Sequence, residues 1–90
     1  MFSWDEAKRR LNLRKHGIDF EDAVRIFRGL TFTAEDMRED YGERRFQTLG
    51  LLEDQLVSVT HTERGEDIRI ISIRKATRDE AQFYFSHFTD

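Results

Sequence analysis

The spacing of apolar residues changes twice along this chain of 90 residues, and these changes limit the folds that it can adopt. Up to Gly29 the apolar residues recur at helical intervals, whereas between Leu30 and Lys75 they alternate with polar residues, as in strands. From Thr77 onward the helical interval returns. Helices that are separated in the sequence from a run of strands indicate an α+β domain. We expect two N-terminal helices, an antiparallel sheet of about four strands and a C-terminal helix, in a single domain spanning residues 1–90.

End signals mark the two N-terminal helices. Ser3 and Glu6 are spaced as a capping box, which predicts that the first helix begins there. Gly17 suits the left-handed residue just past the end of that helix. Asp19 suits the N-cap of the second helix, which Gly29 closes. The residues expected to be buried are Trp4, Ala7 and Leu11 in the first helix and Phe20, Ala23, Val24 and Phe27 in the second.

Turn residues divide the middle of the chain into strands. Residues 53–55 and 64–66 are predicted to be turns, and the acidic residues 35–43 are predicted to be a loop. A second capping box, Thr77 with Glu80, begins the last helix. The predicted strands are 30–34, 44–52, 56–63 and 67–75, and the apolar positions of the last helix are Ala81, Tyr84, Phe85 and Phe88.

Alternation also assigns the strand residues to faces of the sheet. If the last hairpin turns about Gly65, one face carries Val57, Val59, Ile71 and Ile73 and meets the helices. The opposite face then carries Ser58, Thr60, Ile70, Ser72 and Arg74, which favours a polar groove flanked by arginines. This register points His61 and Lys75 toward the valines, and a slip by one residue would reverse that assignment.

Composition excludes several classes of protein. The chain has no cysteine, so disulfides cannot stabilise the fold. The three histidines lack the spacing of a metal site, and the glycines are too scattered for a phosphate loop, so we expect neither a metal nor a cofactor. The N-terminus resembles no signal peptide and no apolar run reaches membrane-spanning length, so we expect a cytoplasmic protein that makes no membrane contact. A net charge of −3 argues against a general nucleic-acid coat protein, and any contact with DNA should come from a partner.

Arginine far outnumbers lysine, and five cations fall between His61 and Glu80. The planar guanidinium group binds two oxygens of a phosphate at once, which makes phosphate the first candidate for a ligand. We expect Arg64, Arg74 and Arg78 to stabilise the negative charge of a reacting phosphate. His61 and Glu63 are the candidate proton carriers, with Lys75 as a further one if its pKa is depressed. Other candidates for RNA contact are Arg45, Arg69, Lys75 and Lys15, although arginines with acidic neighbours more often form surface ion pairs.

Two motifs give the chain a resemblance to a known family. The first is Lys15-His16-Gly17-Ile18 followed by Phe20, and the second is RIISIRKAT at residues 69–77. With Trp4-Asp5, Asn12, Tyr41-Gly42-Glu43, Arg45, Gly50, Glu80 and Tyr84 in the same order, the chain resembles the BrnT family of toxins over nearly its whole length. Arg28-Gly29 stands where the family often has an acidic residue.

The resemblance implies a toxin of a type II toxin–antitoxin system with a RelE-like fold. Such a toxin would cleave RNA without a metal ion, would stop translation and would be silenced by a BrnA-type antitoxin, with the ribosome as a further candidate partner. Two alternatives remain open at this point: a module that grips RNA or the ribosome without cutting, and a subunit whose arginines serve an acidic partner. Loss of cleavage on removal of Arg74 or Arg78 would identify the enzyme, whereas binding without products would identify the module.

Overall fold

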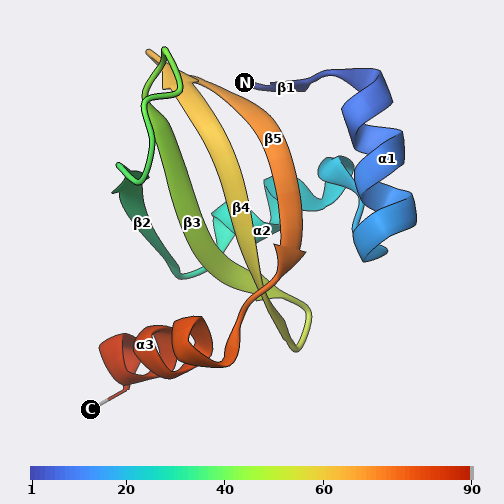
Figure 1. Ribbon diagram of the computed structural model, residues 1–90. Coiled ribbons are helices and arrows are strands. Elements are labelled where there is room, and N and C mark those ends of the chain that lie inside the picture. The colour runs from blue at the N-terminus through green and yellow to red at the C-terminus, as the bar shows by residue number, and fades with distance from the viewer. Residues whose placement is uncertain (90) are drawn as a thin grey trace.

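The computed structural model describes residues 1–89, which form a five-stranded sheet with helices against both of its faces (Figure 1). The strand order is β1-β5-β4-β3-β2, so β1 and β2 are the two edges. The elements in chain order are β1 (Phe2–Trp4), α1 (Glu6–His16), the 3-10 helix η1 (Phe20–Asp22), α2 (Ala23–Arg28), β2 (Thr31–Asp36), β3 (Arg45–Leu52), β4 (Gln55–Arg64), β5 (Asp67–Lys75) and α3 (Arg78–Phe88). The predicted α+β class is confirmed. Within residues 1–89, every helix is too short or too polar to cross a membrane.

The first strand corrects two of the predictions. Phe2–Trp4 runs parallel to β5, with Phe2 opposite Ile68 and Trp4 opposite Ile70, so the sheet is mixed and has five strands. Helix α1 begins later than predicted, because Asp5 and not Ser3 is its N-cap and accepts a hydrogen bond from the Lys8 amide at 3.0 Å. Extended backbone at this point directs the two aromatic side chains of β1 into the core. Their ring partners are Phe27 for Phe2, at 5.4 Å, and Phe20 for Trp4, at 6.3 Å.

Helix α1 packs through a polar residue, so the predicted apolar stripe is wrong. Ala7 is exposed and Leu11 is 57% exposed, whereas Asn12 is buried. The Asn12 amide nitrogen donates to the carbonyl oxygens of Ile73 at 2.8 Å and Ile18 at 3.0 Å, and its oxygen accepts from the Ile73 amide at 3.1 Å. One side chain therefore bonds both backbone groups of Ile73, as a neighbouring strand would, and attaches α1 to the edge of β5.

The turn from α1 to α2 follows the predicted signals. Gly17 has a left-handed backbone with φ of 72°, and its amide donates to Leu13. The Asp19 side chain caps η1 by accepting from the Glu21 amide at 3.0 Å. Helix α2 buries Ile26, which the sequence pattern did not select, over Gly50 of β3. The core between these helices and the sheet consists of Ile18, Phe20, Ala23, Ile26, Val57, Val59, Ile70 and Ile73.

A bulge changes the faces of β5. The four long strands lie within two residues of their predicted bounds, but the pairing shifts after Thr60, which faces Ser72, because His61 then faces Ile70. Ile71 is left without a partner across the ladder, and Ile70 takes its place in the core. The predicted position of Ile70 on the face away from the helices is therefore wrong. A bulged residue reverses the alternation that follows it, which a simple period of two cannot anticipate.

Helix α3 covers one end of the opposite face (Figure 1). Its predicted capping box is confirmed: Thr77 accepts from the Glu80 amide at 3.2 Å, and Glu80 accepts from the Thr77 amide at 2.8 Å. Tyr84 is buried and donates a hydrogen bond to the carbonyl oxygen of Leu30 at 2.7 Å. Phe85, which was predicted to be buried, is half exposed. The other buried members of this smaller core are Leu49 and Leu56.

Candidate functional site

The face of the sheet opposite α1 and α2, beyond the part that α3 covers, is polar and is called the open face here. It carries hydroxyl and amide side chains from β3, β4 and β5, and its arginines lie along its margins. Successive residues of a strand alternate between faces, so the register that directs Val57 and Val59 to the helices directs their neighbours to the open face. The uncharged polar residues of the open face are Gln47, Ser58, Thr60, Thr62 and Ser72.

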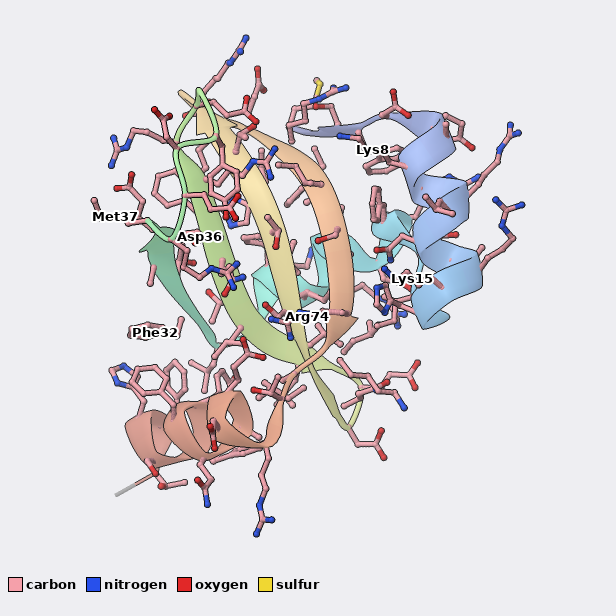
Figure 2. The ribbon with its side chains drawn as sticks, in the orientation of Figure 1. Lys8, Lys15, Phe32, Asp36, Met37 and Arg74 are labelled. Atoms are coloured by element: carbon pink, nitrogen blue, oxygen red, sulfur yellow. The ribbon has the colours of Figure 1, made fainter. Side chains whose placement is uncertain are left out.

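Arg74 lies at the margin where the open face meets α3 (Figure 2). Its two terminal nitrogens donate to the two carboxylate oxygens of Glu80 at 2.8 and 3.0 Å, and one of them also donates to the Lys75 carbonyl at 3.0 Å. The hydrogen bonds to Glu80 raise the pKa of Arg74, while burial and the positive charge of Arg38 act in the opposite direction. The same pair lowers the pKa of Glu80. The guanidinium fork is thus fixed in a position where it holds two oxygens of a planar anion.

Arg38, which the sequence analysis did not select, contributes a second guanidinium group near Arg74. It lies in the loop after β2 and makes two hydrogen bonds to the Asp36 carboxylate, both 2.8 Å long. Asp36 is almost fully buried, and its hydrogen bonds to Arg38 hold its pKa far below the usual range. Tyr41 donates its hydroxyl proton to the same carboxylate at 3.2 Å. The sequence analysis did not select Arg38 because it lies in a segment that is mostly acidic.

Arg45 is packed against the same loop. Its guanidinium carbon lies 4.2 Å from the centre of the Tyr41 ring, and its Nε lies 3.5 Å from a carboxylate oxygen of Glu43. That Nε is buried and makes no hydrogen bond, and the same is true of the Ser58 hydroxyl. Buried polar groups are nearly always hydrogen-bonded, so an unpaired donor and an unpaired hydroxyl from residues of one sheet face are notable. Both groups lie beneath the surface, so a ligand reaches them only if the side chains above them move.

Arg64 and Arg69 lie at the hairpin end of the open face. They line a hollow of about 360 Å³ together with Thr62, Ser3 and acidic residues of the neighbouring turns. The register places Arg69 opposite Thr62 and Arg74 opposite Ser58. Those two positions are four residue steps apart along β4, which corresponds to about 13 Å. The arginines therefore occupy both ends of the open face.

Two predicted proton carriers lie on the other face of the sheet. His61 is fully buried between Phe27 and Phe46, and its Nε2 is 2.7 Å from the Thr48 hydroxyl. Burial lowers the pKa of His61, although the negative charge of Glu63 opposes this shift. A carboxylate oxygen of Glu63 lies 3.5 Å from the other ring nitrogen. The predicted direction of His61, toward the core valines, agrees with the structure, and the sheet separates it from Arg74.

The remaining predicted residues surround the site without joining it. Lys75 is exposed at the end of β5, and Arg78 is exposed in the first turn of α3. Lys15 lies on α1 beside β5, whereas Asp36 ends β2 at the other edge of the sheet (Figure 2). Among residues 1–89, no group of three or more metal-binding side chains is close enough together to hold an ion.

A comparison with protein families shows to which family the chain belongs. Residues 4–80 match the family model described as the ribonuclease toxin, BrnT, of a type II toxin-antitoxin system. No curated protein matches the chain. The matched range contains the whole sheet except the first two residues of β1, and it ends at Glu80, so both members of the Arg74–Glu80 pair lie within it.

Proposed function

Since the chain belongs to the BrnT family of ribonuclease toxins of type II toxin–antitoxin systems, we propose that it cleaves RNA on the open face of its sheet without a metal ion. Membership of this family implies an RNA substrate and an antitoxin partner. We further propose that cleavage stops translation in the cytoplasm, with the ribosome as a candidate partner, and that a BrnA-type antitoxin neutralises the toxin. In this proposal the fold is RelE-like, and DNA binds only through the antitoxin.

The observation that carries the proposal is the geometry of Arg74. Its fork already holds two carboxylate oxygens of Glu80 at 2.8 and 3.0 Å, and two oxygens of a phosphate have a similar spacing. A phosphate can therefore replace Glu80 with little movement of the arginine. Glu80 remains attached to the Thr77 amide when this exchange occurs. We propose that Arg74 binds the phosphate at which RNA is cut and that Glu80 is its counter-ion in the free protein.

Cleavage of RNA without a metal uses the ribose 2′-hydroxyl as the nucleophile. Its oxygen forms a bond to the neighbouring phosphorus, and the bond from phosphorus to the 5′-oxygen of the next nucleotide breaks. The products carry a 2′,3′-cyclic phosphate and a 5′-hydroxyl, and one proton moves from the 2′-oxygen to the departing 5′-oxygen. Negative charge increases on the phosphate oxygens during this step, and fixed guanidinium groups stabilise that charge. Arg74 is assigned this role, with Arg38 as the second cation.

Within residues 1–89, no histidine of the sheet lies on the open face, so none is placed there to transfer protons. His61 is sealed in the core, and Glu63 belongs to the same side of the sheet. The carboxylates of Asp36 and Glu80 both have lowered pKa values, which makes them weak bases while their arginines hold them. We propose that His61 supports the fold and that orientation and charge supply most of the catalysis. Water carries the protons in this account.

The other arginines extend the phosphate-binding track. Arg64 and Arg69 bind phosphates of the RNA backbone at the β4–β5 hairpin, about 13 Å along the sheet from Arg74. Arg45 contributes its unpaired buried Nε from the β3 side. Arg78 and Lys75 lie just outside this track, beyond Arg74, and Lys15 is most distant from it. The track explains the preference for arginine over lysine in the chain.

The test is RNA cleavage by the purified free protein in the presence of EDTA. The account expects cleavage under these conditions, with products that carry 2′,3′-cyclic phosphates and 5′-hydroxyls. Activity that disappears in EDTA and returns with magnesium would refute the metal-independent mechanism. Salt-dependent RNA binding by a folded protein without any product, with or without added ribosomes, would instead support the non-catalytic binding module.

A further inference from the structure

Strand β2 forms an open edge of the sheet, and its first four residues, Thr31 to Ala34, carry no charge that would oppose the addition of another strand. It pairs with β3 over six successive residues without a shift in register, and its outer side has no strand beside it within residues 1–89. Proteins commonly protect such an edge with lysine, proline or a bulge. Thr31–Asp36 contains none of these. The unpaired backbone groups of the edge are therefore available to a partner segment.

Aromatic side chains are exposed directly beside this edge. The Phe32 ring lies 4.8 Å from that of Phe83 and 4.9 Å from that of His87, so β2 and α3 together build one aromatic cluster. Phe83 is 47% exposed. Figure 2 shows Phe32 between β2 and α3 and Met37 at the outer side of the sheet. The cluster is held against the edge because Tyr84 of α3 is hydrogen-bonded to the residue that precedes β2.

Exposed apolar residues also mark both ends of β2. Leu30 is 66% exposed and Met37 is 80% exposed, and they lie immediately before and after the strand. Together with the aromatic cluster they surround an open strand edge with apolar surface. The contiguous part of this surface is the cluster of Phe32, Phe83 and His87, and an exposed apolar group beside unpaired backbone indicates a site of protein contact.

We infer that the outer edge of β2 and the cluster of Phe32, Phe83 and His87 bind an extended segment of the antitoxin, which adds a strand to the sheet. The inference rests on the proposed function, because that function requires an antitoxin. Backbone hydrogen bonds to β2 provide the attachment, and alternate apolar side chains of the segment pack on the aromatic cluster. This surface lies at the edge of the sheet, beyond the arginine track.

The charge of the residues next to β2 indicates which kind of segment can bind there. Residues 35–44, at the end of β2 and in the following loop, hold five acidic and two basic side chains, which equals the whole net charge of −3. The segment of the antitoxin should therefore carry basic residues where it passes this loop. The strand edge itself, Thr31–Asp36, carries no arginine or lysine, so it offers no cation to the phosphates of RNA.

The test measures the affinity of purified BrnA-type antitoxin for the wild-type toxin and for two variants. Phe83→Ser removes an exposed ring of the cluster, and we expect the affinity to fall about tenfold or more, as for an aromatic anchor of an interface. Leu13→Ser is the matched control, because Leu13 is 40% exposed on α1, where the sheet core separates it from β2. It should leave the affinity unchanged. Equal affinities for Phe83→Ser and the wild type would overturn the inference.

Hydrogen exchange of the same complex gives an independent result. The amides of Thr31–Asp36 that have no partner in the free toxin should become protected when the antitoxin binds. Protection confined to other strands or helices would contradict strand addition at β2. A free toxin that is already dimeric, and that Phe83→Ser makes monomeric, would assign the surface to a second copy instead.

RNA measurements on the free variants separate this inference from the proposed function. Phe83→Ser should cleave RNA as fast as the wild type, because the cluster takes no part in the reaction. A loss of RNA affinity in this variant would assign the aromatic cluster to stacked bases and would overturn the antitoxin surface. Failure of the wild type to cut RNA would refute the proposed function, while the affinity comparison with the antitoxin would still be valid.

Discussion

The attachment of α1 through Asn12 predicts an unusual order of mutational effects. Asn12→Leu replaces the amide with an apolar side chain of similar size and removes three hydrogen bonds, of 2.8, 3.0 and 3.1 Å. It leaves both backbone groups of Ile73 and the carbonyl of Ile18 without their partner. Each lost bond of this kind costs about 1 kcal/mol when the abandoned group recovers some hydration, so we expect a loss of about 3 kcal/mol in the free energy of unfolding.

Leu11→Ala is the informative comparison. A helical apolar stripe would make Leu11 a core residue, and truncation of a buried leucine costs roughly 2–5 kcal/mol. In the structure Leu11 is 57% exposed, so we expect a loss of about 0.5 kcal/mol or less. The sequence pattern therefore predicts that Leu11→Ala is the more destabilising variant, whereas the structure predicts that Asn12→Leu is.

Urea unfolding followed by circular dichroism measures both variants. A domain of this size has an m-value of about 1 kcal/mol/M, so Asn12→Leu should lower the midpoint by about 3 M. In a thermal scan the same loss corresponds to a fall in Tm of roughly 12–24 °C. The reasoning is refuted if Leu11→Ala destabilises the protein more than Asn12→Leu does.

Three further predictions concern the counter-ion, the core and the buried histidine. Glu80→Gln removes the negative charge that pairs with Arg74 but keeps an oxygen that accepts from the cap of α3. RNA should therefore bind about threefold more tightly to this variant. Glu21→Gln makes the same change in charge elsewhere and should have a smaller effect on RNA binding. Tighter binding by Glu21→Gln alone would contradict the role of Glu80. Gly50→Ala places a Cβ 2.9 Å from the buried Ile26 side chain, so the free energy of unfolding in urea should fall by about 1–3 kcal/mol. An unchanged free energy of unfolding would show that the core can shift to accommodate the methyl group. Burial lowers the pKa of His61 below 6.5, so the unfolded state binds the proton first, and stability should fall as the pH drops below that value. His61→Gln should reduce this fall below about pH 6.5, and an unchanged pH dependence of the urea midpoint would count against it.

Local signals in the sequence predicted the elements that local physics determines. The capping box at Thr77 and the glycine at position 17 have the predicted geometry, because each acts within one turn of a helix. The four long strands follow from alternation and turn residues. The α+β class followed from these elements together, since it depends on their order and less on their precise ends.

Features that depend on distant partners were missed. β1 is only three residues long, and it is a strand because β5, more than 60 residues later, pairs with it. Asn12 is buried because Ile73, 61 residues away, offers unpaired backbone. The bulge at Ile71 results from how two strands align, and neither strand alone carries a signal for it.

The candidate site was predicted in part for the same reason. Arg74 stood out because it ends a strand and precedes a helix cap, and the structure places it on the open face beside Glu80. His61 was attractive for its chemistry, but burial separates it from that face. Arg38 was missed because it lies in the mostly acidic segment 35–43, which was predicted only to be a loop. Its approach to Arg74 depends on the fold of the loop.

The most direct test of the central claim compares RNA cleavage in EDTA by wild type, Arg74→Ala and Arg10→Ala. Arg10 is an exposed arginine of α1 on the other side of the sheet, so its replacement makes the same change in charge away from the open face. The account predicts that Arg74→Ala abolishes cleavage with an unchanged circular dichroism spectrum, whereas Arg10→Ala cuts as the wild type does. Full activity of a folded Arg74→Ala protein would contradict the assignment of the site to the open face.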